Sequence, residues 1–442
     1  MADLVSCRPY LYWTAFIAAL GGFLASFATC IIAGALSFIC REFHVSTLQE
    51  GVVASMILLG ALAGSIFCGY IADRLGRRFS FFAAAFLFLA TGILALYVHS
   101  LASLLILRFA TGIAVGISSI LIPMYLAEIA PPANRGAFVT SYQFSVAIGT
   151  FAAYLVSMSL SDSGNWRYMF FFAAIPAFFQ LVALFFFPES PKWLASLGRR
   201  QESLYIQKKF FKNLPVMSAR LETSSEAVQK AGFKELFTSS FRFVLLIGVL
   251  LSLAQQFVGV NAIVFFAPKI FGEAGFADAR HALGPTLLLG MINCFSTFCS
   301  FFLIDRLGRR KLLLTSQLGV AISLGVLVMA FALALPLAGF IAVGALVLYI
   351  GSYALGLGPV TWVLISEIYP LPIRSKAIAF MTFLNWSCNY LVVLTFPYLL
   401  SEFGSAWTFS LYAAIAISSY YLCMRFIPET KGKSLEALEK EL

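Results

Sequence analysis

Neutral carboxamide side chains occur repeatedly inside the long apolar stretches of this chain. A carboxamide offers a carbonyl acceptor and an NH₂ donor without a charge, which suits a neutral ligand that carries several hydroxyl groups. An unpaired amide is costly in an apolar environment, so a group of them requires a ligand, water or a polar neighbour. For any single amide, a hydrogen bond between helices is the alternative. We predict binding roles for Gln143, Gln255, Gln256, Asn261, Asn293, Asn385 and Asn389.

The spacing of these amides predicts where helices bend. Gln256 and Asn261 lie five positions apart, about 140° around a regular helix, so they share a face only if the helix breaks between them. Gly259 lies in that interval, and broken helices commonly form transporter sites. Asn385 and Asn389 lie one turn apart, on one face of a continuous helix.

Two tryptophans complete the candidate binding set. Trp362 and Trp386 can each place a flat apolar face against the C–H side of a ring and donate an indole N–H to a hydroxyl. Gly356, Gly358 and Pro359 precede Trp362 and predict a second irregular helix there.

The charged residues are concentrated in motifs that occur twice, in the same order, about half a chain apart. Asp-Arg-Leu-Gly-Arg-Arg begins at Asp73 and again at Asp305, and each copy follows an apolar run. A duplicated chain with its dense charge at helix ends is typical of a transporter with two similar halves. The repeated set is Asp73, Arg74, Arg77, Arg78, Glu128, Arg135 and Glu189, then Asp305, Arg306, Arg309, Arg310, Glu367, Arg374 and Glu429.

Ion pairs within this repeated set are candidates for a gate, because such pairs can break and form again. Asp73 and the arginines can pair across their turn or with a neighbouring helix. We expect Glu128 with Arg135, and Glu367 with Arg374, to tie the two halves together at their cytoplasmic ends and to hold the outward-facing state. The alternative is that the charges only set topology and fix helix ends.

The elements that must position these residues are membrane-spanning helices. Hydrophobic residues make up 61% of the chain and charged residues 11%, against about 25% charged in soluble domains. We predict an all-α membrane protein with twelve transmembrane helices in two pseudo-symmetric six-helix halves. The predicted spans are 12–36, 50–72, 79–98, 102–127, 137–159, 167–187, 243–268, 284–304, 312–335, 337–365, 376–400 and 406–426.

The predicted domains follow from these spans. They are a first half (1–188), a cytoplasmic linker with short helices (189–241), a second half (242–427) and a cytoplasmic tail (428–442). The net charge of +10 is concentrated in the segments that alternate with an N-terminus set inside, which predicts two cytoplasmic termini and no nucleic-acid partner. The eight cysteines lack metal-ligand spacing, and no nucleophile–base pair or phosphate loop occurs, so we expect no metal, cofactor or catalytic residue.

In these motifs the chain resembles the sugar porter family of the major facilitator superfamily, the glucose- and xylose-type hexose and pentose transporters. The likeness rests on the doubled Asp-Arg-Leu-Gly-Arg-Arg, Gln-Gln-Phe-Val-Gly-Val-Asn from Gln255, and Pro-Glu-Ser-Pro-Lys-Trp from Pro188. The resemblance implies alternating access, a monosaccharide substrate, a lipid bilayer around the helices and, we expect, a monomer. Short outer loops indicate a bacterial inner membrane. A polyol porter and a non-transporting sugar sensor are alternatives.

One position departs from the family pattern. Proton-coupled sugar porters usually carry an aspartate in the first span, paired with an arginine in the fourth, and here those positions are Ala28 and Arg108. All aspartates and glutamates of this chain are expected in loops or at helix ends. A proton relay, however, needs an ionisable group in the transport path. We therefore expect a facilitative uniporter, and the alternative is a proton-coupled sugar or polyol symporter.

Overall fold

A computed structural model describes residues 8–131, 134–211, 236–238, 241–276, 279–333, 337–370 and 373–431. Within these ranges the regular structure is helical, and eleven helical stretches are long and apolar enough to span a membrane. The last stretch, Lys376–Phe426, is 51 residues long and contains Gly404 in a non-helical conformation. Gly404 therefore divides this stretch into two helices, and the predicted all-α membrane fold is confirmed.

The contacts of the chain divide into two compact units. The first unit comprises Met1–Thr29, Gly60–Gly149 and Phe170–Val228, and the second comprises Cys30–Leu59, Thr150–Met169 and Gln229–Leu442. Helices α3 and α6 each contribute to both units, so this division does not follow the two predicted halves. The boundaries 1–188, 189–241, 242–427 and 428–442 stay predictions, and 212–235 and 432–442 lie outside the described residues.

The first unit is built on closely packed helices with small residues at their contacts. A Cβ atom on Gly116 of α5 would lie 2.1 Å from the Ala61 carbonyl oxygen of α3, and one on Gly64 of α3 would lie 2.3 Å from the Ile113 carbonyl oxygen. Such contacts bring two membrane helices together at backbone distance. Helices that contribute to this unit are α1 (Pro9–Cys30), α3 (Thr47–Leu75), α4 (Arg77–Leu94), α5 (Leu101–Ile129), α6 (Arg135–Leu160), α8 (Ala174–Leu184), α9 (Pro191–Ser196) and α10 (Arg200–Phe210).

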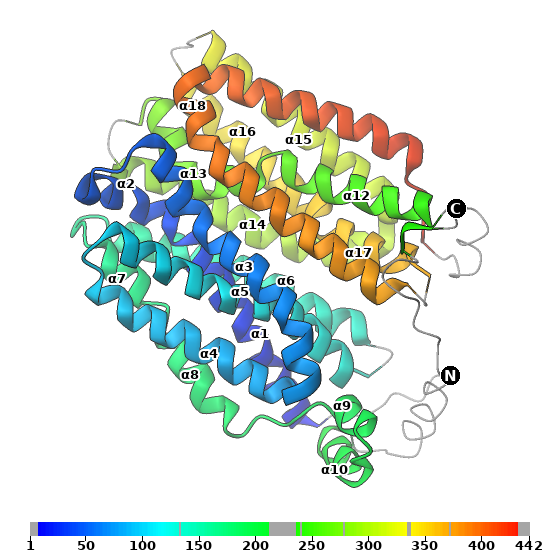
Figure 1. Cartoon of the computed structure of the whole chain (residues 1–442). Helices are drawn as coiled ribbons and strands as arrows, with labels where there is room; N and C mark the ends of the chain where they lie inside the picture. Colours follow the sequence, from blue (N-terminus) through cyan, green and yellow to red (C-terminus); the bar gives the residue numbers. More distant parts are fainter. Residues whose placement is uncertain are drawn as a thin grey trace. The chain divides into compact units, whose positions relative to one another are not determined.

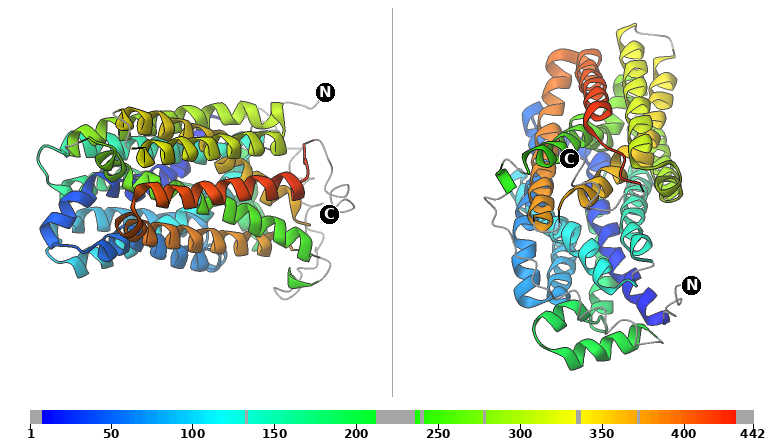
Figure 2. Two further views of the ribbon diagram at one scale, coloured as in Figure 1. Left: turned by 90° about the horizontal axis from the view of Figure 1, so that it is seen from above. Right: turned by 90° about the vertical axis from the view of Figure 1, so that its right-hand side faces the viewer.

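The second unit contains the remaining helices and the beginnings or ends of α3 and α6. Helices α15, α16 and α18 lie side by side, and α12 packs along α18 (Figures 1 and 2). Its other helices are α2 (Ile32–Phe43), α7 (Trp166–Phe171), α12 (Arg242–Phe257), α13 (Val260–Glu273), α14 (Ala279–Leu307), α15 (Arg309–Ala332), α16 (Ala338–Ser352), α17 (Gly358–Ile368) and α18 (Arg374–Phe426).

Two irregularities of the second unit match the bends predicted from sequence. Helix α12 ends at Phe257 and α13 begins at Val260, because Gly259 between them adopts a φ of 89°, a conformation that favours glycine. A π-helical turn, Tyr353–Leu357, separates α16 from α17. Both irregularities lie next to predicted binding residues.

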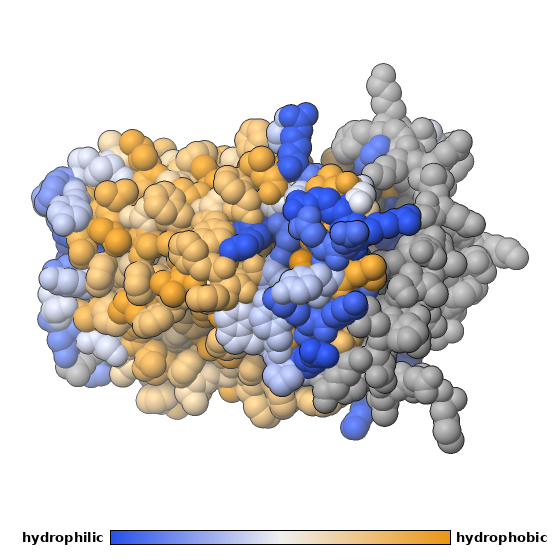
Figure 3. Space-filling model, turned by 90° about the horizontal axis from the view of Figure 1, so that it is seen from below, coloured by the Kyte–Doolittle hydropathy of each residue, from blue (hydrophilic) through white to orange (hydrophobic). Residues whose placement is uncertain are grey.

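The surface agrees with a membrane environment. On the face shown in Figure 3, hydrophobic residues cover a broad central area and hydrophilic residues gather toward the ends. Many large apolar side chains are exposed, among them Phe86, Ile106, Phe186 and Phe340. Apolar exposure on this scale is expected where lipid, rather than water, is the solvent.

Candidate functional site

Four of the predicted amides form one hydrogen-bonded chain across the second unit. Asn261 Nδ2 donates to Gln256 Oε1 at 3.0 Å, and Gln256 Nε2 donates to Asn385 Oδ1 at 2.9 Å. Asn385 Nδ2 then donates to Gln255 Oε1 at 2.7 Å. The chain joins α12, α13 and α18, so residues far apart in sequence meet in one polar cluster, which we call the amide chain.

Backbone carbonyls at the π-helical turn set the direction of the amide chain. Gln255 Nε2 donates to the Gly358 carbonyl at 2.8 Å, with the Leu357 carbonyl at 3.4 Å. A carbonyl can only accept, so Gln255 must turn its NH₂ group toward it and its oxygen toward Asn385. Each amide then fixes the orientation of the next, and Asn261 ends the chain with its carbonyl oxygen uncommitted among the described residues.

The amide chain is buried at one end and accessible at the other. Gln255, Gln256 and Asn385 are at most 7% exposed, whereas Asn261 is partly exposed. Three neutral amides in an apolar interior satisfy each other, which removes most of the cost of burying them. The accessible end can therefore bind the hydroxyl of a ligand without disturbing the buried end.

The other predicted binding residues do not form hydrogen bonds with the amide chain. Asn389 lies one turn beyond Asn385 on α18, as expected, but its buried Oδ1 has no hydrogen-bond partner among the residues that the structure describes. Asn293, Trp362 and Trp386 are partly exposed in the second unit, and none of them has a hydrogen bond to the amide chain. Gln143 lies on α6 in the first unit, partly exposed.

In the membrane-spanning helices, two buried amides among the described residues were not predicted from sequence. Gln180 of α8 is 2% exposed and donates to the Ile17 carbonyl of α1 at 3.1 Å. Gln317 of α15 is 1% exposed and donates to the Cys423 sulfur at 3.2 Å. Each of these bonds joins two helices of the same unit. A hydrogen bond between helices is the alternative role that we expected for a single amide.

Arg108 is fully buried and bonds to the backbone at the expected coupling position. Its Nη1 donates to the Ala28 carbonyl at 3.0 Å, and its guanidinium carbon lies 5.6 Å from the centre of the Phe170 ring. Carbonyl and ring face both stabilise a cation in an apolar setting. Residue 28 therefore accepts the hydrogen bond of Arg108 with its backbone carbonyl, because alanine has no side-chain carboxylate.

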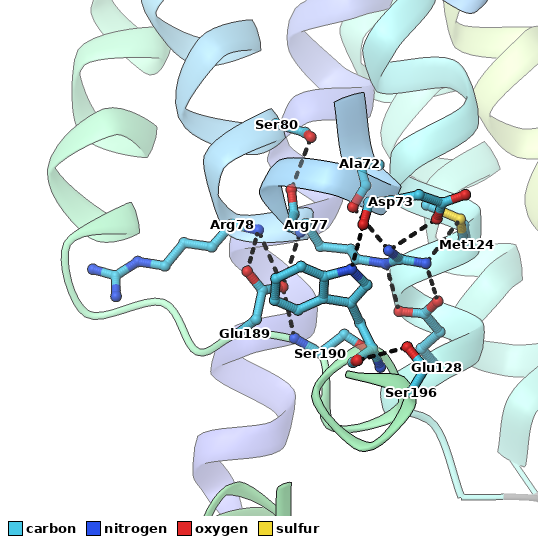
Figure 4. Close-up of polar contacts among 12 residues, drawn as sticks. Ala72, Asp73, Arg77, Arg78, Ser80, Met124, Glu128, Glu189, Ser190 and Ser196 are labelled. Carbon is cyan, nitrogen blue, oxygen red and sulfur yellow. Dashed lines mark hydrogen bonds and ion pairs between the residues drawn. The ribbon is translucent and has the colours of Figure 1, made fainter. Parts of the chain in front are cut away.

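The first charged cassette comprises Asp73, Arg77, Arg78, Glu128 and Glu189 (Figure 4). Arg77 Nη2 and Nε donate to the two oxygens of Glu128 at 3.0 Å and 3.2 Å, and Nη1 reaches Asp73 at 3.2 Å. The side chains of Arg77 and Glu128 are only 8% and 14% exposed. This forked, largely buried pair is the geometry in which an arginine binds a carboxylate most strongly.

Glu189 caps the start of α4 in the first cassette. Its carboxylate accepts from the backbone N–H groups of Arg77 at 2.9 Å and Arg78 at 3.1 Å, which lie at the positive end of the helix dipole. Burial nevertheless raises the pKa of Glu189 above its ordinary value, and the backbone N–H groups and Arg77 oppose that shift.

The second charged cassette comprises Arg309, Arg310, Glu367, Glu429 and Thr430. Arg309 Nη2 and Nε both converge on one oxygen of Glu367, at 3.2 Å and 3.3 Å, and the Thr430 hydroxyl donates to the other oxygen at 2.6 Å. Glu429 accepts from the backbone N–H groups of Arg309 and Arg310 at the start of α15. The side chains of Arg309 and Glu367 are 17% and 30% exposed.

One predicted pairing of the gate is wrong in this structure. Glu367 pairs with Arg309, and Arg374 Nε donates instead to the Tyr369 carbonyl at 2.9 Å. Glu128 likewise pairs with Arg77. The reason is geometric, because the arginine at the start of the neighbouring helix can reach the carboxylate with both arms of its fork. The side chains of Arg135 and Asp305 lie outside the described residues, and the roles of Arg74 and Arg306 as gate residues stay predictions.

Comparison with known proteins identifies relatives along the whole chain. A family model described as "Sugar (and other) transporter" matches residues 14–442. The galactose-proton symporter of Escherichia coli K12 is 36% identical over 99% of this chain and 95% of its own length. The arabinose-proton symporter of the same strain is 37% identical over 96% of this chain and 92% of its own length.

A solved structure matches the structure of this chain over the same extent. It shows the inward open conformation of the xylose transporter XylE from E. coli, with a TM-score of 0.84 at 30% identity, covering 98% of this chain and 100% of that one. The predicted fold is confirmed by this match, and all of these relatives are transporters rather than enzymes.

Proposed function

Because the chain belongs to the sugar porter family of the major facilitator superfamily, we propose that it carries a monosaccharide across a membrane by alternating access. The observation that carries the proposal is the amide chain, whose accessible end at Asn261 offers uncharged hydrogen-bonding groups. Such an end suits a sugar hydroxyl and offers nothing to balance the charge of an organic ion.

The substrate is proposed as a neutral hexose or pentose. The relatives are described as carriers of galactose, arabinose and xylose, three neutral sugars that differ in a few hydroxyl positions. Trp362 and Trp386 are proposed to pack against the ring, and Asn293, Asn389 and Gln143 to bind further hydroxyls. The amide oxygen of Asn389, buried and without a partner, is the group that gains most from a ligand hydroxyl.

Proton coupling is the form of transport that the relatives favour. Two of them are described as sugar–proton symporters and share more than a third of their residues with this chain. On this basis we propose that the sugar enters together with a proton, carried by a group other than residue 28.

Facilitative uniport is the second candidate, and one specific observation favours it. Arg108 bonds to the backbone carbonyl of Ala28, where a side-chain carboxylate would be its partner in a proton-coupled porter. An alanine side chain at position 28 cannot take up a proton, and a uniporter needs no acid there.

Uptake into proteoliposomes tests the proposal and separates the two forms of coupling. Labelled glucose, galactose and xylose are offered with and without an inward proton gradient. Accumulation that a protonophore abolishes indicates symport, and equilibration that ignores the gradient indicates uniport. Ala28→Asp sharpens the test, because in a uniporter it introduces the missing acid and should make uptake depend on pH.

Variants of the amide chain test the site itself. Gln256→Ala removes the link between Asn261 and Asn385 and should lower uptake at least tenfold, and Trp362→Ala should do the same. Gln201→Ala is the matched control, since this amide is exposed on α10 and should leave uptake unchanged. Normal uptake by both site variants would remove the assignment.

The inner-membrane location, the cytoplasmic termini and the monomeric state are proposed on the sequence pattern alone.

A further inference from the structure

Segments of the first six spans meet segments of the last six within the second unit. They come from the end of each helix that lies far from the repeated charged motifs, which we call the far end. The residues in contact there are Glu50 and Gly51 of α3 and Tyr154 of α6, with Val264 and Lys269 of α13, Gly290 of α14 and Leu394 of α18. We call this contact the far-end seam.

Backbone packing in the seam leaves no room for side chains. A Cβ atom on Gly51 would lie 2.2 Å from the Leu394 carbonyl oxygen, and one on Gly290 would lie 2.9 Å from the Tyr154 ring. Both distances are far below van der Waals contact. The two sides of the seam are therefore in full contact, and the far end is closed along these residues.

One hydrogen bond crosses the seam because a proline frees its acceptor. Pro268 lies inside α13 and has no N–H, so the Val264 carbonyl, four residues earlier, lacks its helical partner. The Tyr154 hydroxyl donates to that carbonyl at 2.8 Å, and Tyr154 is 1% exposed. If the seam opens, both groups lose their partner in an apolar setting unless water replaces it.

One ion pair crosses the seam as well. Lys269 Nζ lies 2.7 Å from Glu50 Oε2, and the side chain of Glu50 is 13% exposed. Glu50 lies in the first turn of α3, where the helix dipole also stabilises a carboxylate. The pair links the first turn of α3 to the second half of α13.

We propose that Tyr154–Val264 and Glu50–Lys269 form a latch that holds the far end closed and that must release for the protein to open on that side. The inference rests on the proposed alternating access, because a protein with one fixed conformation would have no use for a releasable contact. Both bonds are specific, directional and broken by a small separation, whereas apolar packing alone would resist opening less sharply.

Spin labels on the two sides of the seam measure the opening directly. The native cysteines are replaced by alanine, and labels are attached at Ser159→Cys of α6 and Ser401→Cys of α18, both exposed positions near the far end. Electron–electron distance distributions are recorded for the full-length protein in lipid nanodiscs. The expected starting result is a population dominated by one short distance.

Charge exchange distinguishes a latch from a general structural role. Glu50→Lys and Lys269→Glu should each raise the ratio of open to closed molecules about tenfold. The double exchange should restore the original ratio, because the pair is then present in reversed order. Tyr154→Phe removes only the hydroxyl and should raise the ratio about fivefold.

Ser405→Ala provides the matched control. Ser405 bonds to Glu273 near the same end of the bundle, but both residues belong to the last six spans. Its removal should leave the distance distribution unchanged. Single exchanges that leave the distances unchanged, or a double exchange that fails to restore them, would overturn the latch. A shift in distances without sugar uptake would instead support the latch and contradict the proposed substrate.

Discussion

The two charged cassettes share their residue types but hold their carboxylates differently. In the first, the two nitrogens of Arg77 reach separate oxygens of Glu128. In the second, the two nitrogens of Arg309 converge on one oxygen of Glu367, and Thr430 binds the other. The first pair is also more buried, with side-chain exposures of 8% and 14% against 17% and 30%.

This difference shows that two copies of one sequence motif can form arginine–glutamate contacts of different strength. Both cassettes have a glutamate cap, Glu189 in the first and Glu429 in the second. In the first, Arg77 bonds to both oxygens of Glu128. The second shares its carboxylate with the chain that follows α18, through Thr430. We infer that the second cassette is the weaker contact and the one more easily released.

Removal of the arginine should separate the two cassettes most clearly. Arg77→Met leaves Glu128 buried without its partner and should cost about 3–5 kcal/mol of stability. Arg309→Met leaves a more exposed carboxylate that keeps Thr430, and should cost about 1.5–3 kcal/mol. Thermal unfolding of the purified variants in detergent measures both, and equal losses would contradict the ranking.

Alanine at the turn glycines should affect both cassettes alike. Gly76 and Gly308 have φ angles of 95° and 89°, and an added Cβ would lie 2.5 Å from Glu189 and 2.8 Å from Glu429. Gly76→Ala and Gly308→Ala should therefore each cost about 1–3 kcal/mol. A loss in only one variant would show that the two turns differ after all.

Loss of one hydroxyl should weaken only the second cassette. Thr430→Val removes the bond to Glu367 and nothing else in the cassette, at a cost of about 1.5 kcal/mol. Thr395→Val is the control, since that exposed hydroxyl of α18 bonds only to its own helix. The melting temperature of Thr430→Val should lie about 1–2 °C below that of Thr395→Val. Equal melting temperatures would show that the Thr430 hydroxyl does not stabilise the cassette.

The smallest effect should be a pH dependence of stability that comes from Glu189 in the first cassette. Burial raises the folded-state pKa of Glu189 above its ordinary value of 4.5, so the folded protein holds this proton more tightly than the unfolded chain. The contribution of Glu189 to stability is therefore greatest below pH 4.5 and falls as the pH rises through the folded pKa.

Glu189→Gln cannot titrate and should lack this component. The melting temperature of the unmodified protein, relative to the variant, should decline as the pH rises above 4.5. A relative increase over the same range would mean that the backbone N–H groups at the start of α4 outweigh burial. That result would place the folded pKa below its ordinary value.

The sequence predicted the helices and their breaks well, because hydropathy and glycine act locally. Gly259 marked the bend that lets Asn261 reach Gln256, and the spacing of Asn385 and Asn389 matched a continuous helix. It did not reveal that Gln255 donates to the Gly358 carbonyl, because the π-helical turn that precedes Gly358 depends on three-dimensional packing.

The pairing of charged residues was harder to predict, because it also depends on three-dimensional packing. Sequence order favoured Glu367 with Arg374, but the neighbouring helix brings Arg309 to that carboxylate. Gln180 and Gln317 were missed because the sequence does not distinguish a buried amide that binds a ligand from one that bonds to another helix. Only their actual partners, the Ile17 carbonyl and the Cys423 sulfur, identify them as structural.

The fixed direction of the amide chain also has an electrical consequence. Four carboxamide dipoles point head to tail from the Gly358 carbonyl to Asn261, so their fields add in the same way as the peptide dipoles of a helix. The negative pole lies at the accessible oxygen of Asn261. That pole attracts the hydrogen of a hydroxyl and repels an anion, so a sugar phosphate or a sugar acid would be turned away where the neutral sugar is accepted.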